Sequence, residues 1–135
     1  MSEVREAADL IGVWRLVGGT ITDESGAWQG QPYGPLGTGL LSLTADGRMM
    51  AVLVDSRPET VSPREYASYC GTYTFDGATL ITTTYAWSAE RFAEPQVRRA
   101  RIEDGRLVLN PPTVERDGMR LTRELVWERI SPLSL

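Results

Sequence analysis

Few side chains in this chain can do chemistry, because it contains no His and all 14 of its basic residues are Arg. This excludes an imidazole base, a His metal site and a Schiff-base lysine. Cys70 stands alone, so it forms no internal disulfide or metal site, and no His is present to activate it. Proton transfer or polarisation would depend on Asp, Glu, Tyr, Arg, hydroxyl groups or water, and we expect no metal and no cofactor.

Two adjacent arginines are candidates for a polar contact inside the fold. Arg98 and Arg99 lie on a predicted strand over residues 96–103, so they point to opposite faces. The inward one keeps its charge and needs a partner. That partner is either Glu124 or Glu128 of the last strand, or a carboxylate or carbonyl group of a bound molecule. Alternation alone does not decide which Arg faces inward.

Tyrosines and carboxylates are the other candidates. Tyr69 and Tyr73 belong to an aromatic cluster whose default role is core packing, although a buried hydroxyl can also donate to a carbonyl or act as a weak acid. Met50 lies on a strand where one of two adjacent Met residues must face inward. Asp55 and Glu65 flank a loop, and two such carboxylates could share acid and base work.

The elements that must position these residues are mostly strands. Short segments separated by Asp-Gly turns predict eight to ten antiparallel strands, as in an up-and-down barrel or a sandwich. Helix-forming residues predict a short helix over 3–10, and the capping box Ser62-Pro63-Arg64-Glu65 predicts a second one over 63–68 at the rim. The Gly- and Pro-rich stretch 27–39 is predicted to be a loop that acts as a lid.

The first and last strands carry a predicted plug. Trp14 lies on the first strand, and Arg123 and Arg129 lie on the last. An indole can fill one end of a small barrel, and a guanidinium from the closing strand can lie across it. We therefore predict that Trp14, together with Arg123 or Arg129, is a structural closure.

Composition limits the class of protein. With 135 residues, 41% hydrophobic and 24% charged, the chain fits one soluble domain over residues 1–135. A net charge of -4 argues against a nucleic-acid partner. No secretion signal or apolar span is visible, so we expect a cytoplasmic protein with no membrane partner. A homodimer through an exposed strand or the loop around Trp28 is left open.

Six short motifs carry a resemblance to a known family. In this order and spacing, from about residue 10 to residue 130, the chain resembles the bacterial and fungal lipocalin-like domain family, small barrels distantly related to the calycins. The resemblance implies an all-β, antiparallel, up-and-down β-barrel, and its steadier Gln-Val-Arg segment implies that Arg98 is the inward Arg. The motifs are Leu10-Ile-Gly-Val-Trp14-Arg-Leu, Leu43-Thr-Ala-Asp-Gly47-Arg-Met49, Tyr69-Cys-Gly71-Thr-Tyr73, Gln96-Val-Arg98-Arg, Gly105-Arg-Leu-Val-Leu109 and Leu125-Val-Trp127-Glu-Arg129.

The resemblance says less about activity than about fold. Members often carry a His on the strand that here runs from Thr79 to Tyr85, where this chain has Thr82 or Thr83 instead. Any chemistry which that His supplies in relatives is therefore lost or replaced in this chain.

The favoured interpretation is a container for a small, mostly apolar organic molecule. The alternative is a cofactor-free isomerase, cyclase or dehydratase that acts on a natural-product-like substrate in the same cavity. A third interpretation is a barrel packed solid by its own side chains. The predicted ligand-binding residues are Met50, Tyr73, Thr83, Tyr85 and Arg98 in the interior, with Tyr33 and Tyr69 in the segments at the mouth.

Overall fold

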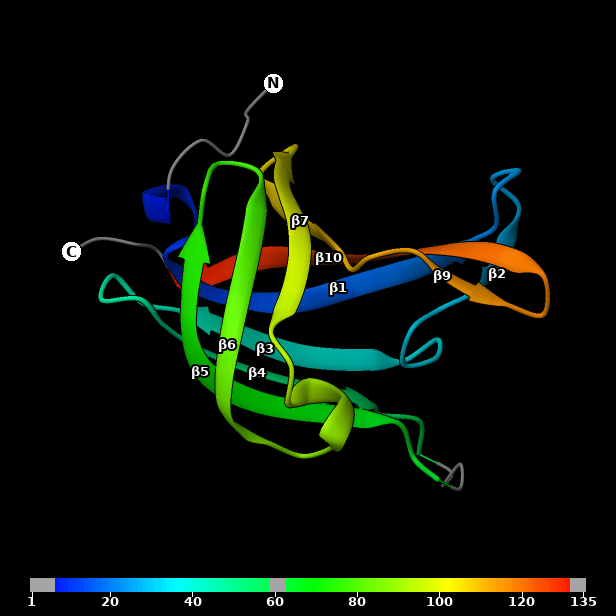
Figure 1. The fold of residues 1–135 in the computed structure, drawn as a ribbon, viewed down its shortest axis with the longest axis horizontal. Coiled ribbons are helices and arrows are strands. Elements are labelled where there is room, and N and C mark those ends of the chain that lie inside the picture. The colour runs from blue at the N-terminus through cyan, green and yellow to red at the C-terminus, as the bar shows by residue number, and fades with distance from the viewer. Residues whose placement is uncertain (1–6, 59–62, 132–135) are drawn as a thin grey trace.

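The computed structural model describes residues 7–58 and 63–131, and eight of its strands close into an antiparallel barrel (Figure 1). The first strand pairs with both the second and the last strand of the barrel wall, which closes the sheet on itself. This confirms the predicted all-β, up-and-down barrel. The wall strands are β1 (Gly12–Thr22), β3 (Gly37–Leu43), β4 (Arg48–Asp55), β5 (Tyr66–Phe75), β6 (Thr79–Trp87), β7 (Gln96–Glu103), β8 (Arg106–Asn110) and β10 (Met119–Ser131).

Two short strands lie outside the barrel proper. β2 (Trp28–Gly30) pairs with the end of β1, and β9 (Val114–Arg116) pairs with the start of β10. Together they extend one side of the molecule beyond the barrel wall, as the ribbon shows. The exposed Trp28 lies on this extension, so part of the predicted lid loop is a strand.

The Asp-Gly turns form as predicted. In the last two hairpins, both turn residues have positive φ: Asp104 at 53° and Gly105 at 78°, then Asp117 at 52° and Gly118 at 78°. Two successive residues in this region are typical of the type I′ turn, whose twist matches that of the flanking strands. Asp tolerates this backbone better than most side chains, and Gly has no Cβ to clash.

Helical structure is limited to two short 3₁₀ turns in the described residues, η1 (Ala7–Leu10) and η2 (Glu90–Phe92). Only the end of the predicted helix over 3–10 is described, and it is η1. The predicted helix over 63–68 is wrong, because β5 begins at Tyr66 and pairs with β4. A single helical turn does not compete with pairing to a neighbouring strand. Ser62, the first residue of the predicted capping box, lies outside the described residues.

The core fills the end of the barrel next to η1. Trp14, Leu43 and Leu107 come from three different strands and are 1%, 1% and 0% exposed. Phe92 of η2 is buried at the other end, so aromatic side chains occupy both ends of the interior. Across the described residues, no helix is long and apolar enough to span a membrane.

Candidate ligand-binding site

The barrel has a closed end built on Trp14. The Trp14 indole Nε1 donates to the Leu10 carbonyl at 2.9 Å, which ties the first strand to η1. The Arg129 guanidinium carbon lies 4.3 Å from the centre of the indole ring. The two guanidinium ends of Arg129 donate to the carbonyls of Asp9, at 2.8 Å, and of Ile11. The predicted indole–guanidinium contact is therefore present, and Arg129 makes it.

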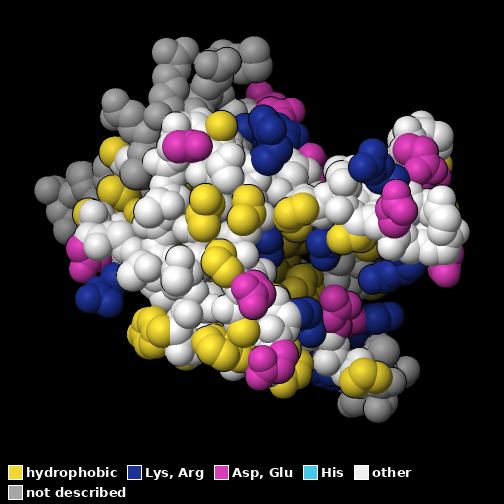
Figure 2. All heavy atoms as spheres, in the orientation of Figure 1, with side chains coloured by type: hydrophobic (Ala, Val, Ile, Leu, Met, Phe, Trp, Pro, Cys, Tyr) yellow, Lys and Arg dark blue, Asp and Glu magenta, His cyan; other side chains and the backbone are white. Residues whose placement is uncertain are grey.

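At the opposite end, the barrel wall opens between β7 and β10. The β7–β8 ladder ends with Arg99 opposite Asn110, and the β8–β10 ladder ends with Leu109 opposite Leu125. Pro111 and Pro112 follow directly, and proline has no N–H to continue a ladder. Figure 2 shows a hollow beside β7 in this face of the molecule, with hydrophobic atoms at its floor and both Arg and acidic side chains around its rim.

Arg98 faces the interior beside this opening. Burial alternates along β7. Gln96 and Ala100 are buried, and Arg98 between them is half-buried, whereas the positions between these three are exposed. Arg99 is exposed and points outward. Gln96 orients Arg98, since its Oε1 accepts from the Arg98 guanidinium at 3.1 Å while its amide nitrogen donates to the Glu94 carbonyl at 2.6 Å.

Arg123 lies with Arg98 and not with Trp14, which corrects its predicted place in the plug. On β10 it shares the inner face with the buried Trp127, and its position pairs with Ile21 of β1, beyond the end of β8. Burial lowers the pKa of Arg123, and the nearby positive charge of Arg98 lowers that pKa further. Its Nε is buried and has no hydrogen-bond partner among the described residues.

The carboxylates predicted to pair with an inward Arg are taken by arginines on the outer face. Glu124 accepts from Arg101 at 3.0 Å, and Glu128 is paired with Arg15. Within the described residues, no carboxylate lies within salt-bridge distance of Arg98 or Arg123. Neither inward guanidinium group is therefore ion-paired to a carboxylate in this part of the chain, and the Glu65 charge acts on Arg123 only from beyond ion-pair distance.

Tyr33 and Tyr69, the two residues predicted for the segments at the mouth, are both partly buried and are electrostatic neighbours of each other and of the arginines. Tyr69 is partly buried against the core, and its ring stacks on Phe92 with centroids 4.9 Å apart. Burial raises the pKa of Tyr69, and the Arg98 guanidinium partly offsets this rise. Burial also raises the pKa of Tyr33, with smaller contributions from Glu65 and Tyr69. Both phenols therefore stay protonated at neutral pH and can donate hydrogen bonds.

Tyr33 reaches the mouth from a strained turn. Gly34 N donates to the Gln31 carbonyl at 3.1 Å, and Tyr33, the third residue of this turn, has a φ of 61°. Gly or Asn usually takes this position after a proline such as Pro32, and an ordinary side chain there costs about 1 kcal/mol. Packing of the Tyr33 ring against the core offsets that strain. A strained aromatic residue at an opening is an observation that favours a functional role.

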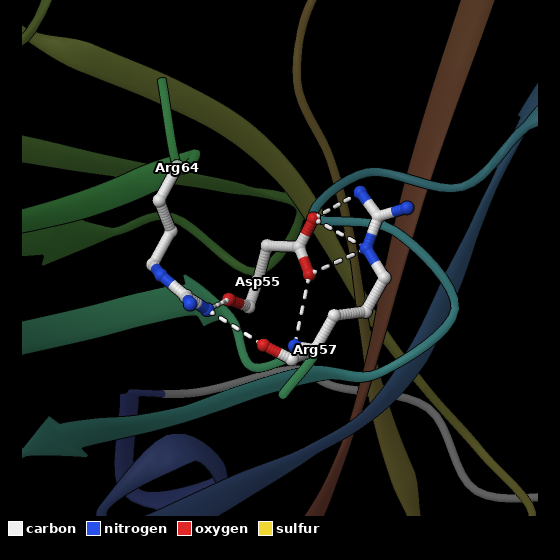
Figure 3. Close-up of polar contacts among 3 residues, drawn as sticks. All are labelled: Asp55, Arg57 and Arg64. Carbon is white, nitrogen blue, oxygen red and sulfur yellow. Dashed lines mark hydrogen bonds and ion pairs between the residues drawn. The ribbon is translucent and has the colours of Figure 1, made fainter. Parts of the chain in front are cut away.

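An ion pair supports the turn from below (Figure 3). The Asp55 carboxylate is 3% exposed and accepts from Arg57 Nε at 3.0 Å and Nη2 at 2.5 Å. Arg64 donates to the Asp55 carbonyl at 2.5 Å and to the Arg57 carbonyl at 3.1 Å. A Cβ on Gly34 would lie 2.9 Å from Asp55 Oδ2, so the turn packs directly on this pair. The glycine is needed both for that approach and for its φ of 72°.

The predicted carboxylate pair does not act as a proton-sharing dyad in this arrangement. Arg57 holds the pKa of the Asp55 carboxyl below its usual value, so that group is ionised and engaged. Glu65 is exposed, and its backbone carbonyl, not its side chain, accepts from Asp55 N at 2.9 Å.

Three predicted interior residues lie on the outer face. Met50 is 59% exposed, Tyr85 is 71% exposed, and Thr83 is also exposed, so their predicted interior placement is wrong. Cross-strand partners share a face, and the interior positions are set by Met49 opposite Gly71 and by Tyr73 opposite Thr82. A register shift between Cys70 and Gly71 contributes to the placement of Tyr85.

Tyr73 is inside the barrel but at the closed end. It is 8% exposed, and its hydroxyl donates to the Thr44 carbonyl at 2.6 Å, at the β3–β4 turn. Burial raises the pKa of this phenol. Its polar group is therefore used by the fold and is not offered to a molecule at the mouth.

The sequence reasoning missed three contributors to the site. Arg123 was assigned to the plug, although it stands four positions before Trp127, the same strand spacing that puts two residues on one face. Gln96 and Phe92 were not singled out. No simple signal marks Phe92, because η2 was not predicted.

A separate depression of about 420 Å³ lies on the outer wall, lined by residues of β7, β8 and β10 and the turn between the first two of these strands. Val108 and Val126 form its apolar part, and the charged residues around it have both signs. Its lining residues on β8 and β10 alternate with the inward-facing ones, so the depression lies on the outer face of the wall and is not the site described above.

A closed antiparallel barrel with one plugged end and one open end is a lipocalin-like barrel. The sequence comparison agrees, because the family model described as a lipocalin-like domain matches residues 11–130, and the chain belongs to that family. No curated protein and no solved structure matches the chain. The lipocalin-like barrel is in general a ligand-binding fold.

Proposed function

We propose that the protein binds a small, mostly apolar organic molecule at the open end of the barrel. The observation that carries this proposal is the contrast within one interior: aliphatic and aromatic side chains fill its depth, and protonated donors surround its mouth. Ligand pockets commonly combine apolar walls with a few polar groups that fix orientation.

The surroundings of Tyr69 supply the apolar contact surface. Its ring stacks on Phe92, and η2 itself is anchored because Thr84 Oγ1 donates to the Phe92 carbonyl at 2.6 Å. An aromatic wall fixed in this way can receive a flat apolar molecule with little loss of side-chain freedom. The turn around Tyr33 would cover the bound molecule, in keeping with the predicted lid.

The alternative, a cofactor-free isomerase, cyclase or dehydratase, has one observation in its favour. Tyr69 is a protonated phenol beside the Arg98 guanidinium, and such a pair can polarise a carbonyl. A proton abstraction would also need a base, and the buried carboxylate nearest the turn, Asp55, is held ionised by Arg57 and is therefore a weak one. Binding is therefore the leading proposal. A cytoplasmic location and a homodimer stay predictions of the sequence.

The test is binding of a neutral fluorescent probe, N-phenyl-1-naphthylamine, combined with native mass spectrometry of the purified protein. We expect the probe to bind, and Tyr69→Ala to weaken it about tenfold because one aromatic contact surface is lost. The matched control is Tyr85→Ala, which removes the same side chain from the outer face of the neighbouring strand.

The two variants separate the outcomes. A probe affinity that falls with Tyr69→Ala and is unchanged by Tyr85→Ala supports binding at the mouth. No binding, or binding lost only with Tyr85→Ala, overturns the proposal and favours the solid barrel. A co-purified small molecule seen in the native spectrum gives the ligand class directly, and its chemical conversion on incubation would favour the enzyme alternative.

A further inference from the structure

We propose that the molecule held at the mouth is an apolar organic acid, whose carboxylate lies between Arg98 and Arg123. This inference rests on the proposed function and specifies its ligand. It rests on buried hydrogen-bond donors on the inner face of the barrel that have no acceptor among the described residues.

The buried side-chain nitrogen and oxygen atoms of the described residues that lack a hydrogen-bond partner are both donors. Two buried side-chain nitrogens have no hydrogen-bond partner among the described residues, Arg123 Nε and Trp127 Nε1. Both belong to the inner face of β10, and Trp127 is 2% exposed. Indole and guanidinium nitrogens can only donate, so a group that satisfies them must accept.

The positive charges of Arg98 and Arg123 favour an anionic acceptor over a neutral one. Arg98 and Arg123 lie on the inner faces of β7 and β10, both beyond the end of β8, and the charge of Arg98 acts on Arg123. The carboxylates expected to neutralise them pair instead with Arg101 and Arg15 on the outside. Arg101 is a contrasting case on the outer face, because two carboxylates accept from it, Glu103 at 2.8 Å and Glu124 at 3.0 Å. A neutral carbonyl would satisfy a donor but leave two like charges together, whereas a carboxylate satisfies both requirements.

The position of the two arginines fits this role. They flank the opening where Pro111 ends β8, so an acid group could enter through the gap while the rest of the molecule contacts Phe92 and the aromatic wall. Gln96 already holds Arg98 in place at 3.1 Å, which reduces the ordering that binding requires. A planar guanidinium also matches a carboxylate in two parallel hydrogen bonds.

The experiment compares 2-naphthoate with 2-naphthamide as competitors of the neutral probe N-phenyl-1-naphthylamine. The two competitors share one ring system and a similar shape and differ in charge. We expect wild-type protein to prefer the acid by about tenfold or more, and Arg98→Gln and Arg123→Gln each to remove most of that preference. Arg99→Gln is the matched control, because it changes the outward neighbour on the same strand. Arg123→Lys restores the charge and should recover part of the preference.

Failures of the two proposals are distinguishable. If the probe does not bind, the proposed function fails. If the probe binds and both competitors displace it equally well, or if neither Arg98→Gln nor Arg123→Gln changes the preference, the acid assignment is wrong while binding stands. The wild-type comparison decides the matter even if one variant does not fold.

Discussion

Arg129 and Arg123 lie on the same face of β10 and meet opposite surroundings. Arg129, at the closed end, stacks on Trp14 and donates to two backbone carbonyls. Arg123, at the open end, has a buried nitrogen with no partner in the described residues and a second arginine beside it. One residue type on one strand therefore makes structural contacts at one end, and at the other end it is the group that we propose to bind a ligand.

The two buried indoles also differ in whether the indole nitrogen has a hydrogen-bond partner. Trp14 Nε1 donates to the Leu10 carbonyl at 2.9 Å, whereas Trp127 Nε1 has no partner among the described residues. A buried donor left unsatisfied costs about 1–3 kcal/mol. Trp14 avoids that cost, whereas Trp127, which lies opposite Leu16 and Leu107 in the core, bears it.

The largest effect should come from the plug. Trp14→Ala removes a side chain that is 1% exposed, and we expect the free energy of unfolding to fall by about 3–5 kcal/mol. Urea unfolding followed by circular dichroism measures the change. A loss below about 1 kcal/mol would show that the indole is not the closure of the barrel.

The two arginines provide the most direct test of the comparison. Arg129→Gln leaves the Asp9 and Ile11 carbonyls without a charged donor, and we expect a loss of about 2 kcal/mol in the free energy of unfolding. Arg123→Gln removes a charge that has no carboxylate partner in the described residues, so stability should change by less than about 0.5 kcal/mol or rise.

The same urea experiment applies to both variants, and their order is the result that matters. Equal losses in the free energy of unfolding for Arg123→Gln and Arg129→Gln would mean that both arginines contribute equally to stability. The distinction between a stability arginine and a binding arginine would then be wrong.

The predictions from the sequence were correct for features set by local signals and wrong for features set by strand pairing. Strand count, turns and the Trp14 closure were predictable because Asp-Gly pairs and period-two patterns act locally. The helix over 63–68 was wrong because the local capping signals at Ser62 and Glu65 were outweighed by pairing between the consecutive strands β4 and β5, which a capping signal does not encode. Local signals carry no information on such competition.

The site was predicted only in part, for a related reason. Arg98 and Tyr73 lie on the inner face, where the sequence put them, but Met50, Thr83 and Tyr85 lie on the outer face, and the binding roles of Tyr33 and Tyr69 stay predictions. Alternation gives two faces without saying which is inside, and the register that decides is set by partners such as Met49 opposite Gly71. The sequence left Arg123 and Arg129 as alternatives for the plug because both fitted by type, and the register of β1 and β10 decides, since it puts Arg129 opposite Trp14 and Arg123 opposite Ile21.

Acid should weaken the open end through Asp55. Because its folded pKa lies below its ordinary value of 3.8, Asp55 contributes stability that is present above that value and is lost as the pH falls through the folded pKa. Asp55→Asn should therefore lower stability at neutral pH and reduce the acid dependence of the urea midpoint. The two proteins should become more alike at the lowest pH.

The matched control lies at the other end of the barrel. Asp46, in the β3–β4 turn, also has a lowered pKa, because Thr44 donates to it and Arg48 is near, but its side chain is 70% exposed. Solvent screens such a group, so Asp46→Asn should alter the acid dependence less than Asp55→Asn does. If the two variants show equal slopes, the Asp55–Arg57 pair is not a special support for the Tyr33 turn. A larger slope change for Asp55→Asn would mean that the Tyr33 turn is supported by the buried Asp55 carboxylate and its half-exposed partner Arg57, and that acid should release a bound molecule before it unfolds the closed end.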